Sequence, residues 1–182
     1  MRRRHLLAGI ASVGALGGAG AVATGTTPRV LGFGSDDAEP VEPTTLQSIE
    51  APGSRDGETT IPADGRPTFV DFFGTWCPPC AEQMPALAAA HDRVSDEVLF
   101  VSVTTEDVGG AVSESTVADW WREHDGDWLV AADVTAELAA KLGVGGYPTA
   151  VVLDADGRIA WSDSGVHSAD RLVEAIENAT DR

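Results

Sequence analysis

The two cysteines of this chain, Cys77 and Cys80, lie three positions apart in the segment Trp-Cys-Pro-Pro-Cys at residues 76–80, and the sequence has no other cysteine. Two thiols at this spacing, at the start of a helix, can close a small disulfide ring and open it again. A disulfide stabilises a fold chiefly by removing loop entropy from the unfolded chain, and so short a ring removes little. The spacing therefore indicates redox chemistry rather than a structural crosslink.

The flanking residues predict that the cysteine pair lies between a strand and a helix. Residues 68–73 read Thr-Phe-Val-Asp-Phe-Phe, which is typical of a buried strand, and Gly74 and Thr75 end it. A helix is predicted from about Cys77 to Val94. Its first turn contains two prolines, which are tolerated there because the N–H groups that they lack would have had no partner in the helix.

The helix position assigns different roles to the two thiols. A helix N-terminus carries partial positive charge, so Cys77 is expected to ionise more readily than a free thiol and to act as the nucleophile. Cys80, one turn deeper, would then resolve the mixed disulfide, because exchange proceeds by attack of a thiolate on sulfur. The alternative is half of a zinc site. It would need two further ligands, for which the histidines available after the predicted leader are His91, His124 and His167.

These segments resemble the thioredoxin superfamily, and more narrowly the exported thioredoxin-like reductases of the TlpA/ResA type. The resemblance covers roughly residues 44–180, with its motifs in the same order. The motifs are Val-Asp-Phe-Phe-Gly-Thr-Trp-Cys-Pro-Pro-Cys at 70–80, Met-Pro at 84–85, Gly-Tyr-Pro-Thr at 146–149 and Val-Leu-Asp-Ala-Asp-Gly-Arg-Ile at 152–159. In one departure, many TlpA-like proteins carry a glutamate before Met-Pro, where this chain has Gln83 with Glu82 beside it. The family role of that glutamate is therefore not transferred to this chain.

The resemblance implies an α/β fold of the thioredoxin type, with a central mixed sheet flanked by helices on both faces and an N-terminal hairpin extension. It also implies a role for Asp71, six residues before Cys77, which matches the buried carboxylate behind the thioredoxin active site. A carboxylate in an apolar strand has a raised pKa and can take the proton of Cys80. The alternative is an aspartate that is merely hydrogen-bonded at the end of a strand.

Three further residues are implied to meet the substrate. Pro148 matches the cis-proline of the family, and this would place Tyr147 and Pro148 beside the cysteines, with their backbone available to a substrate strand. Trp76 would cover the disulfide and contact the partner, or it would simply belong to the core.

The elements that must position these residues are predicted to alternate between strands and helices, as an α/β sheet requires. Residues 46–61 are expected to form an entry hairpin with turns at Gly53 and Gly57. The remaining elements are expected in this order: a strand at 98–103, a helix at 113–124, a strand at 128–131, a helix at 134–142, a hairpin of 149–153 with 158–161, and a last helix capped by Ser168.

The N-terminal part of the chain is predicted to precede the thioredoxin-like domain, which is placed at residues 46–182. Residues 1–23 combine three arginines, an apolar run rich in Gly and Ala, and an Ala-Val-Ala site. This pattern is typical of a signal peptide of the twin-arginine type, or alternatively of a weak membrane anchor. Residues 24–45 are predicted to be a flexible acidic linker. The protein is therefore expected to be extracytoplasmic, either secreted or tethered to the outer face of the cell membrane.

The chain is strongly acidic, with 29 Asp and Glu residues against 12 Lys and Arg residues and a net charge of -17. A surface of this sign argues against nucleic acid as a partner, because nucleic acid binding needs a basic surface. Lys141 is the only lysine. Scarce lysine with abundant acid suggests adaptation to high salt, where screening relieves the repulsion between like charges.

Together these features predict a monomeric thiol–disulfide oxidoreductase that needs no bound cofactor or metal. The resemblance implies a reductant that acts on disulfide-containing exported proteins, with apocytochrome c the leading substrate, and that receives electrons from a membrane thiol donor. A disulfide-forming oxidant is the alternative within the same chemistry. A copper-binding metallochaperone that uses His167 is the alternative from another class, although such relatives carry Cys-x-x-x-Cys instead of Cys-x-x-Cys.

Overall fold

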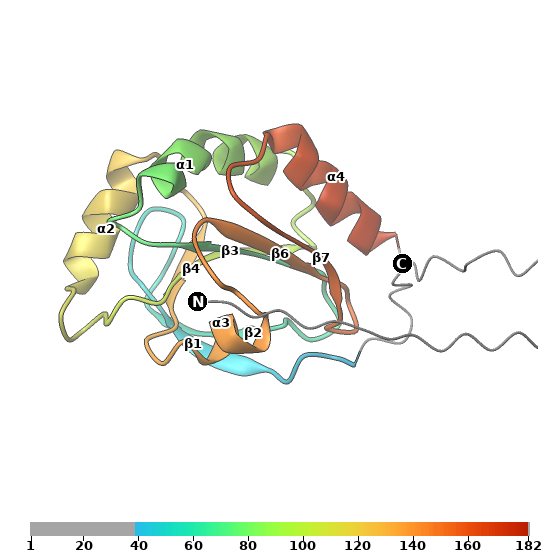
Figure 1. The fold of residues 1–182 in the computed structure, drawn as a ribbon, viewed down its shortest axis with the longest axis horizontal. Coiled ribbons are helices and arrows are strands. Elements are labelled where there is room, and N and C mark those ends of the chain that lie inside the picture. The colour runs from blue at the N-terminus through green and yellow to red at the C-terminus, as the bar shows by residue number, and fades with distance from the viewer. Residues whose placement is uncertain (1–38, 182) are drawn as a thin grey trace, which may run out of the picture. The chain divides into compact units, whose positions relative to one another are not determined.

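A computed structural model of the protein describes residues 39–181, which contain one seven-stranded mixed sheet with helices packed on it (Figure 1). The strand order is β2-β1-β5-β4-β3-β6-β7. The strands are β1 (Thr44–Ser48), β2 (Gly57–Ile61), β3 (Thr68–Phe73), β4 (Leu99–Thr104), β5 (Leu129–Ala132), β6 (Thr149–Leu153) and β7 (Ile159–Ser164). The predicted signal peptide at 1–23 and most of the predicted linker at 24–45 lie outside the described residues.

The centre of the sheet is parallel, since β4 pairs in parallel with β3 on one side and with β5 on the other. β6 and β1 join these strands in antiparallel fashion, and β7 and β2 form the two outer edges. All six residues of β3 are buried, because both faces of the central sheet are covered. β3, β4 and β5 run in the same direction, so the residues that follow them lie at one edge of the sheet.

Helices cover both faces of the sheet, as predicted. They are α1 (Pro78–His91), α2 (Glu114–Glu123), α3 (Glu137–Lys141) and α4 (Ala169–Thr180). Apolar residues of α1, α2 and α4 pack with Phe69 and Phe73 of β3, whereas α3 packs with Val70 and Phe72 on the opposite face. The alternating side chains of a single strand therefore supply both cores.

The predicted N-terminal hairpin is confirmed, and its turn is tied to the rest of the fold. Gly53 has φ +71°, and a Cβ there would lie 2.1 Å from the backbone carbonyl carbon of Asp127. Only glycine fits a left-handed position with the chain so close. The Trp121 indole donates a hydrogen bond of 3.1 Å to the carbonyl of Pro52, which joins the turn to α2.

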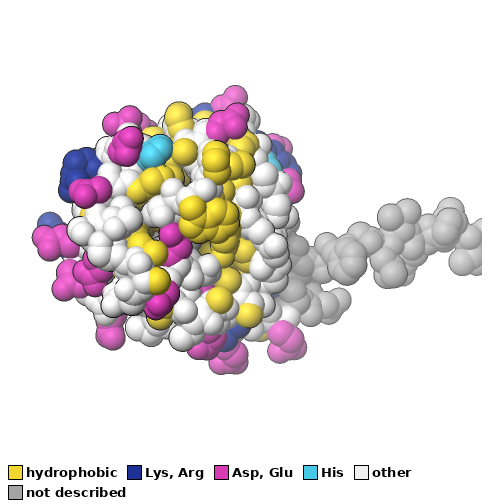
Figure 2. All heavy atoms as spheres, turned by 60° about the vertical axis from the view of Figure 1, so that its left-hand side comes forward, with side chains coloured by type: hydrophobic (Ala, Val, Ile, Leu, Met, Phe, Trp, Pro, Cys, Tyr) yellow, Lys and Arg dark blue, Asp and Glu magenta, His cyan; other side chains and the backbone are white. Residues whose placement is uncertain are grey.

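Charged residues of the chain are mostly acidic, with 29 Asp and Glu against 12 Lys and Arg. On the face drawn in Figure 2, acidic side chains outnumber basic ones and lie around an area of hydrophobic side chains. None of the helices within residues 39–181 is long and apolar enough to cross a membrane.

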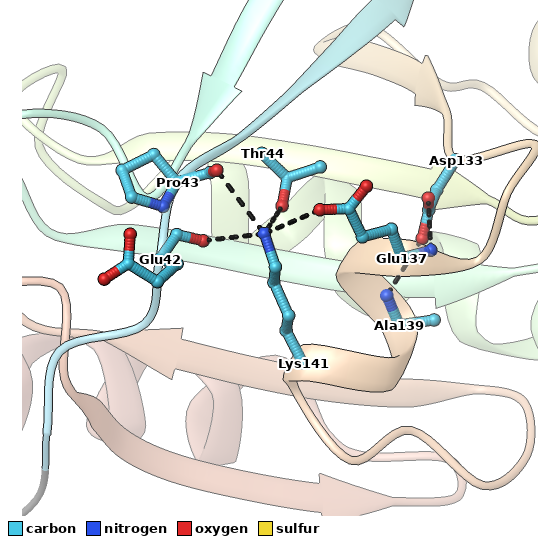
Figure 3. Close-up of polar contacts among 7 residues, drawn as sticks. All are labelled: Glu42, Pro43, Thr44, Asp133, Glu137, Ala139 and Lys141. Atoms are coloured by element: carbon cyan, nitrogen blue, oxygen red, sulfur yellow. Dashed lines mark hydrogen bonds and ion pairs between the residues drawn. The ribbon is translucent and has the colours of Figure 1, made fainter.

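The predicted helix at 134–142 is wrong in length, because α3 begins only at Glu137. Asp133, directly after β5, accepts hydrogen bonds from the backbone N–H groups of Glu137 at 3.0 Å and Ala139 at 2.9 Å (Figure 3). Residues 133–136 must turn to allow these bonds, and Ala136 takes up a left-handed φ of 54°. The side chain of Asp133 thus displaces the start of the helix.

Lys141 connects α3 to the entry of β1 (Figure 3). Its Nζ forms an ion pair of 2.8 Å with Glu137 and donates hydrogen bonds to the hydroxyl of Thr44 at 2.8 Å and to the carbonyl of Glu42 at 3.2 Å. The single lysine of the sequence therefore has a structural position in which it binds the chain just before the hairpin.

The other element boundaries differ from the predictions by one residue or a few. Ser168 caps α4 as predicted, with its hydroxyl accepting the N–H of Arg171 at 3.3 Å. β7 extends to Ser164 instead of ending at 161, because it stays paired with β6 as far as Thr149 opposite Ser164. Its last three residues are exposed, so no hydrophobic pattern marks them as a strand.

Candidate active site

Cys77 and Cys80 form a disulfide at the N-terminus of α1, with their Cα atoms 5.3 Å apart. Cys77 is the N-cap of the helix, and its Sγ accepts the N–H of Cys80 at 3.3 Å. In this oxidised state both residues are buried, with Cys77 4% and Cys80 1% exposed. The predicted strand–Cys-x-x-Cys–helix arrangement is therefore present, and the ring closes without disturbing the helix that follows it.

The turn before Cys77 places an aromatic side chain on the surface. Trp76 is 68% exposed, which excludes the alternative that it belongs to the core. Its ring stands edge-on to that of Tyr147, with centroids 6.0 Å apart. A Cβ on Gly74 would come within 3.0 Å of the Trp76 indole, so glycine leaves the room that this ring orientation needs.

The loop that contains Tyr147 and Pro148 lies beside this turn. The peptide bond between the two residues is cis, as the resemblance implied. Pro148 is buried, and its carbonyl accepts the N–H of Gly165 at 2.9 Å. The contact between Trp76 and Tyr147 brings this cis-proline loop against the cysteine turn from a position some seventy residues further along the sequence.

Asp71 lies on the face of β3 that is packed by α1, in line with Phe69 and Phe73. It is only 1% exposed. Its carboxylate accepts a 3.3 Å hydrogen bond from the hydroxyl of Ser102, which in turn accepts the indole N–H of Trp128 at 3.0 Å. Burial raises the pKa of Asp71 to about 7, and the hydrogen bond from Ser102 opposes this only in part. A carboxyl group with this pKa can exchange a proton near neutral pH.

Gln83 joins α1 to the loop before α4. It is 2% exposed, its amide oxygen accepts the N–H of His167 at 2.6 Å, and its amide NH₂ donates to the carbonyl of His167 at 3.2 Å. A glutamate, ionised and able only to accept, could not make both bonds. The glutamine that departs from the TlpA-like pattern therefore makes two hydrogen bonds to the backbone of His167 in this chain, a pair that a glutamate would not make.

The three histidines within residues 39–181 occupy separate places. His91 packs against Phe100 and Trp128, and His124 stacks on Trp120. The ring of His167 contacts Trp161, and its buried Nε2 has no hydrogen-bond partner. No group of three or more His, Cys, Asp and Glu side chains in residues 39–181 is arranged so that it could hold a metal ion.

Polar residues just after β4, which the sequence analysis did not identify, lie at the same edge of the sheet as the cysteines. Glu106 accepts hydrogen bonds from Thr75, and the hydroxyl of Thr105 bonds to that of Tyr147. A signal for them exists in the sequence. The run Thr-Thr-Glu-Asp at 104–107 directly follows a predicted buried strand, and the ends of parallel strands meet at one edge.

The site and its fold define the class of the protein. A redox-active disulfide at a helix N-terminus, a buried carboxylate on the preceding strand and an adjacent cis-proline loop are the features of a thioredoxin-type active site. The family described as Redoxin matches residues 44–179, and the chain belongs to this family.

Curated relatives point to one branch of the superfamily. The chain is 25% identical over 116 residues to the thiol-disulfide oxidoreductase ResA of Bacillus thuringiensis subsp. konkukian, a match that covers 64% of this chain and 65% of that protein. It is 27% identical over 121 residues to the sporulation thiol-disulfide oxidoreductase A of Bacillus subtilis, covering 66% of this chain and 72% of that one. The chain thus spans somewhat less than two thirds of the ResA relative.

The solved structure of StoA from Bacillus subtilis has the same fold. It superposes with a TM-score of 0.62 at 25% identity, covering 74% of this chain and 96% of that one. The predicted thioredoxin fold and the resemblance to ResA-type proteins are therefore confirmed.

Proposed function

We propose that this protein is a thiol–disulfide oxidoreductase that transfers two electrons between its Cys77–Cys80 pair and cysteine pairs of exported proteins. The observation that carries the proposal is the disulfide between these two residues at the N-terminus of α1. The names of the ResA and sporulation relatives support the same activity.

The reaction in the reducing direction needs only groups of this chain and of the partner. The Cys77 thiolate attacks one sulfur of the partner disulfide, forming a mixed disulfide and releasing the partner's other sulfur as a thiolate. The Cys80 thiolate then attacks the Sγ of Cys77, which breaks the mixed disulfide and releases the partner's second thiolate. The partner gains two electrons and two protons, and the protein is left with the disulfide seen in the structure.

Asp71 is proposed as the base for the second step. Cys80 must lose a proton in a buried place, where making a thiolate is costly. Asp71 lies on the strand face toward α1, and its pKa of about 7 lets it accept that proton at neutral pH. Trp76, Tyr147 and Pro148 are proposed to form the surface that meets the partner polypeptide.

The resemblance to ResA-type proteins supports a proposal for the direction of electron flow and for the partners. We infer a reductant with no bound cofactor, acting outside the cytoplasm on disulfide-containing exported proteins. Apocytochrome c before haem attachment is the leading substrate, and a membrane thiol protein is the electron donor. A reduction potential measured against glutathione tests the direction, because about 30 mV corresponds to a tenfold change in the equilibrium. A potential well above that of glutathione would identify an oxidant instead.

The experiment that tests the activity is reduction of insulin disulfides with dithiothreitol as the electron source. Cys77→Ala should abolish the reaction, because it removes the attacking thiol. Cys80→Ala should accumulate mixed disulfides, which non-reducing electrophoresis detects, because nothing resolves them. Trapping by the Cys77 variant but not by the Cys80 variant would reverse the two roles, and an inactive wild-type protein would refute the function.

A further inference from the structure

We propose that Glu106 is a positioning residue, which holds the turn in front of Cys77 in the place that a polypeptide substrate requires. The inference rests on the proposed function, since it concerns the same site. Glu106 is half-buried, and its carboxylate takes no part in the proton transfer or in the thiol–disulfide exchange described above.

The contacts of Glu106 converge on one residue of the cysteine turn. Its Oε2 accepts the backbone N–H of Thr75 at 2.8 Å, and its Oε1 accepts the hydroxyl of Thr75 at 2.8 Å. The hydroxyl of Thr104 donates a further bond of 3.0 Å to Oε2. Hydrogen bonds to an ionised acceptor are shorter and stronger than neutral ones. One carboxylate therefore fixes both the backbone and the side chain of Thr75, two residues before the nucleophile.

The backbone at Glu106 is itself held in place by the central sheet. β4 lies in the middle of the sheet, and its last residue, Thr104, pairs with Phe73 of β3 and with Ala132 of β5. The N–H of Glu106 also bonds to the hydroxyl of Thr104 at 3.2 Å. The turn has no strand pairing of its own, and the Glu106 carboxylate thus holds it in place relative to the central sheet.

The neighbouring residue makes the corresponding contact with the other loop. Thr105 hydrogen-bonds through its hydroxyl to that of Tyr147, and the Tyr147 ring meets Trp76 edge-on. The connection after β4 therefore bonds to the cysteine turn through Glu106 and to the cis-proline loop through Thr105. These two loops carry the three residues proposed to contact the partner, so their relative position is set by adjacent side chains of a third element.

This arrangement predicts different effects on large and small substrates. A protein disulfide must meet Cys77, Trp76 and the cis-proline loop at once, so it depends on their alignment. Oxidised glutathione needs little more than access to the Cys77 thiolate. Loosening the turn should therefore slow the first reaction and spare the second.

The test compares four single variants of the protein. Glu106→Gln keeps the shape of the side chain but removes its charge and one of its acceptor oxygens. Thr75→Val keeps the backbone N–H and removes the hydroxyl donor, whereas Thr75→Ser keeps both donors and should behave as wild type. Glu177→Gln removes a charge of the same sign from an exposed position on α4 and controls for net charge.

We expect kcat/KM for insulin disulfide to fall about tenfold in Glu106→Gln and Thr75→Val, while the rate with oxidised glutathione stays within about twofold, since small misplacements of reacting groups carry costs of this order or larger. Amide exchange at Thr75, followed by NMR, should become faster in Glu106→Gln. A parallel loss with both substrates, or no loss with insulin, would overturn the proposal.

Failure of the positioning can be distinguished from failure of the proposed function. A wild-type protein that reduces neither substrate would refute the function. The positioning proposal would still be decided by Thr75 amide exchange, which needs no substrate. Exchange that is unchanged in Glu106→Gln would refute it.

Discussion

At the residue scale, burial gives Asp71 an acid–base chemistry that a surface aspartate does not have. The side chain is almost fully enclosed and receives one hydrogen bond, from Ser102, so its charged form is poorly solvated. Its pKa of about 7 places the change of charge in the range where thiols begin to ionise. The burial that would let this carboxylate accept the proton of Cys80 should therefore also lower the free energy of unfolding when Asp71 is ionised.

Asp71→Asn should slow release of the mixed disulfide while leaving the first attack by Cys77 nearly unchanged. Asparagine keeps the shape but cannot accept a proton, and a general base of this kind contributes about a hundredfold or more. The loss should be largest above pH 7, where Asp71 is ionised, and should shrink as Cys80 ionises unaided near the reference thiol pKa of about 8.5. Rapid-mixing kinetics with a fluorescent disulfide across pH 6 to 9 measure both steps. Equal slowing of both at every pH would mean that Asp71 only supports the strand.

The stability of the same variant provides an independent check. Between the ordinary pKa of 3.8 and the raised value of about 7, the folded protein binds more protons at Asp71 than the unfolded chain does. The free energy of unfolding should therefore fall as pH rises through this window, by at most about 4 kcal/mol from this group. Asp71→Asn should lack the fall, so that it is more stable than wild type at pH 8 and similar to it at pH 4. Denaturant unfolding at pH 4 and at pH 8 measures this. If the free energies of unfolding of the two proteins differed by the same amount at both pH values, the prediction would be contradicted.

At the element scale, single polar side chains decide where elements begin and how they are joined. Asp133 delays α3 by bonding to N–H groups of its first turn, and Lys141 ties the end of α3 to the chain at the start of β1. In a five-residue helix such contacts matter more than helix propensity, because so short a helix is not stable on its own. The position of the N-terminal hairpin therefore depends in part on one lysine.

Lys141→Met should lower the free energy of unfolding by about 1 to 2 kcal/mol, because it removes the bonds to Thr44 and Glu42 while keeping the apolar stem. Glu137→Gln is the matched control. It removes only the ion pair, in which the Glu137 side chain is 57% exposed, and should cost a few tenths of a kcal/mol. Urea denaturation measures both. Equal losses would mean that Lys141 acts through its ion pair and does not hold the entry strand.

At the scale of the whole molecule, acidic residues far outnumber basic ones, so that much of the negative charge is not neutralised. The net charge of the chain is -17, and ion pairs such as Arg93 with Asp170 and Arg122 with Asp119 lie at exposed positions. Exposed pairs contribute little, so the excess charge acts mainly as repulsion that salt can screen. On the face drawn in Figure 2, an area of hydrophobic side chains lies among acidic ones.

The melting temperature should rise steeply as potassium chloride increases from low to molar concentration, because screening relieves the repulsion in the folded state. Exchanging three exposed acidic residues, Glu58, Glu123 and Glu177, for glutamine should raise the melting temperature at low salt and reduce the slope with salt. Calorimetry across the salt series measures both effects. A melting temperature that is flat across the series would reject adaptation to high salt.

The local sequence by itself was enough to predict the cysteine site, the buried strand before it and the Ser168 cap. Each of these depends on residues within a few positions of one another. Two thiols three apart at a helix start can form a ring in any fold, and a serine before a helix can cap it wherever that helix packs. The alternation of strands and helices indicated an α/β sheet, and the resemblance to the thioredoxin superfamily implied the particular fold.

Only the tertiary structure decided which residues surround the site. Thr75 meets Glu106, Tyr147 meets Thr105, and Gln83 pairs with His167, and every one of these contacts joins residues more than thirty positions apart. They follow from the register of β3 on β4 and from the packing of α1 against α4, which the whole core determines together. A single sequence records the polar residues after each strand but not which of them will meet, because that depends on strand order and register rather than on local preference.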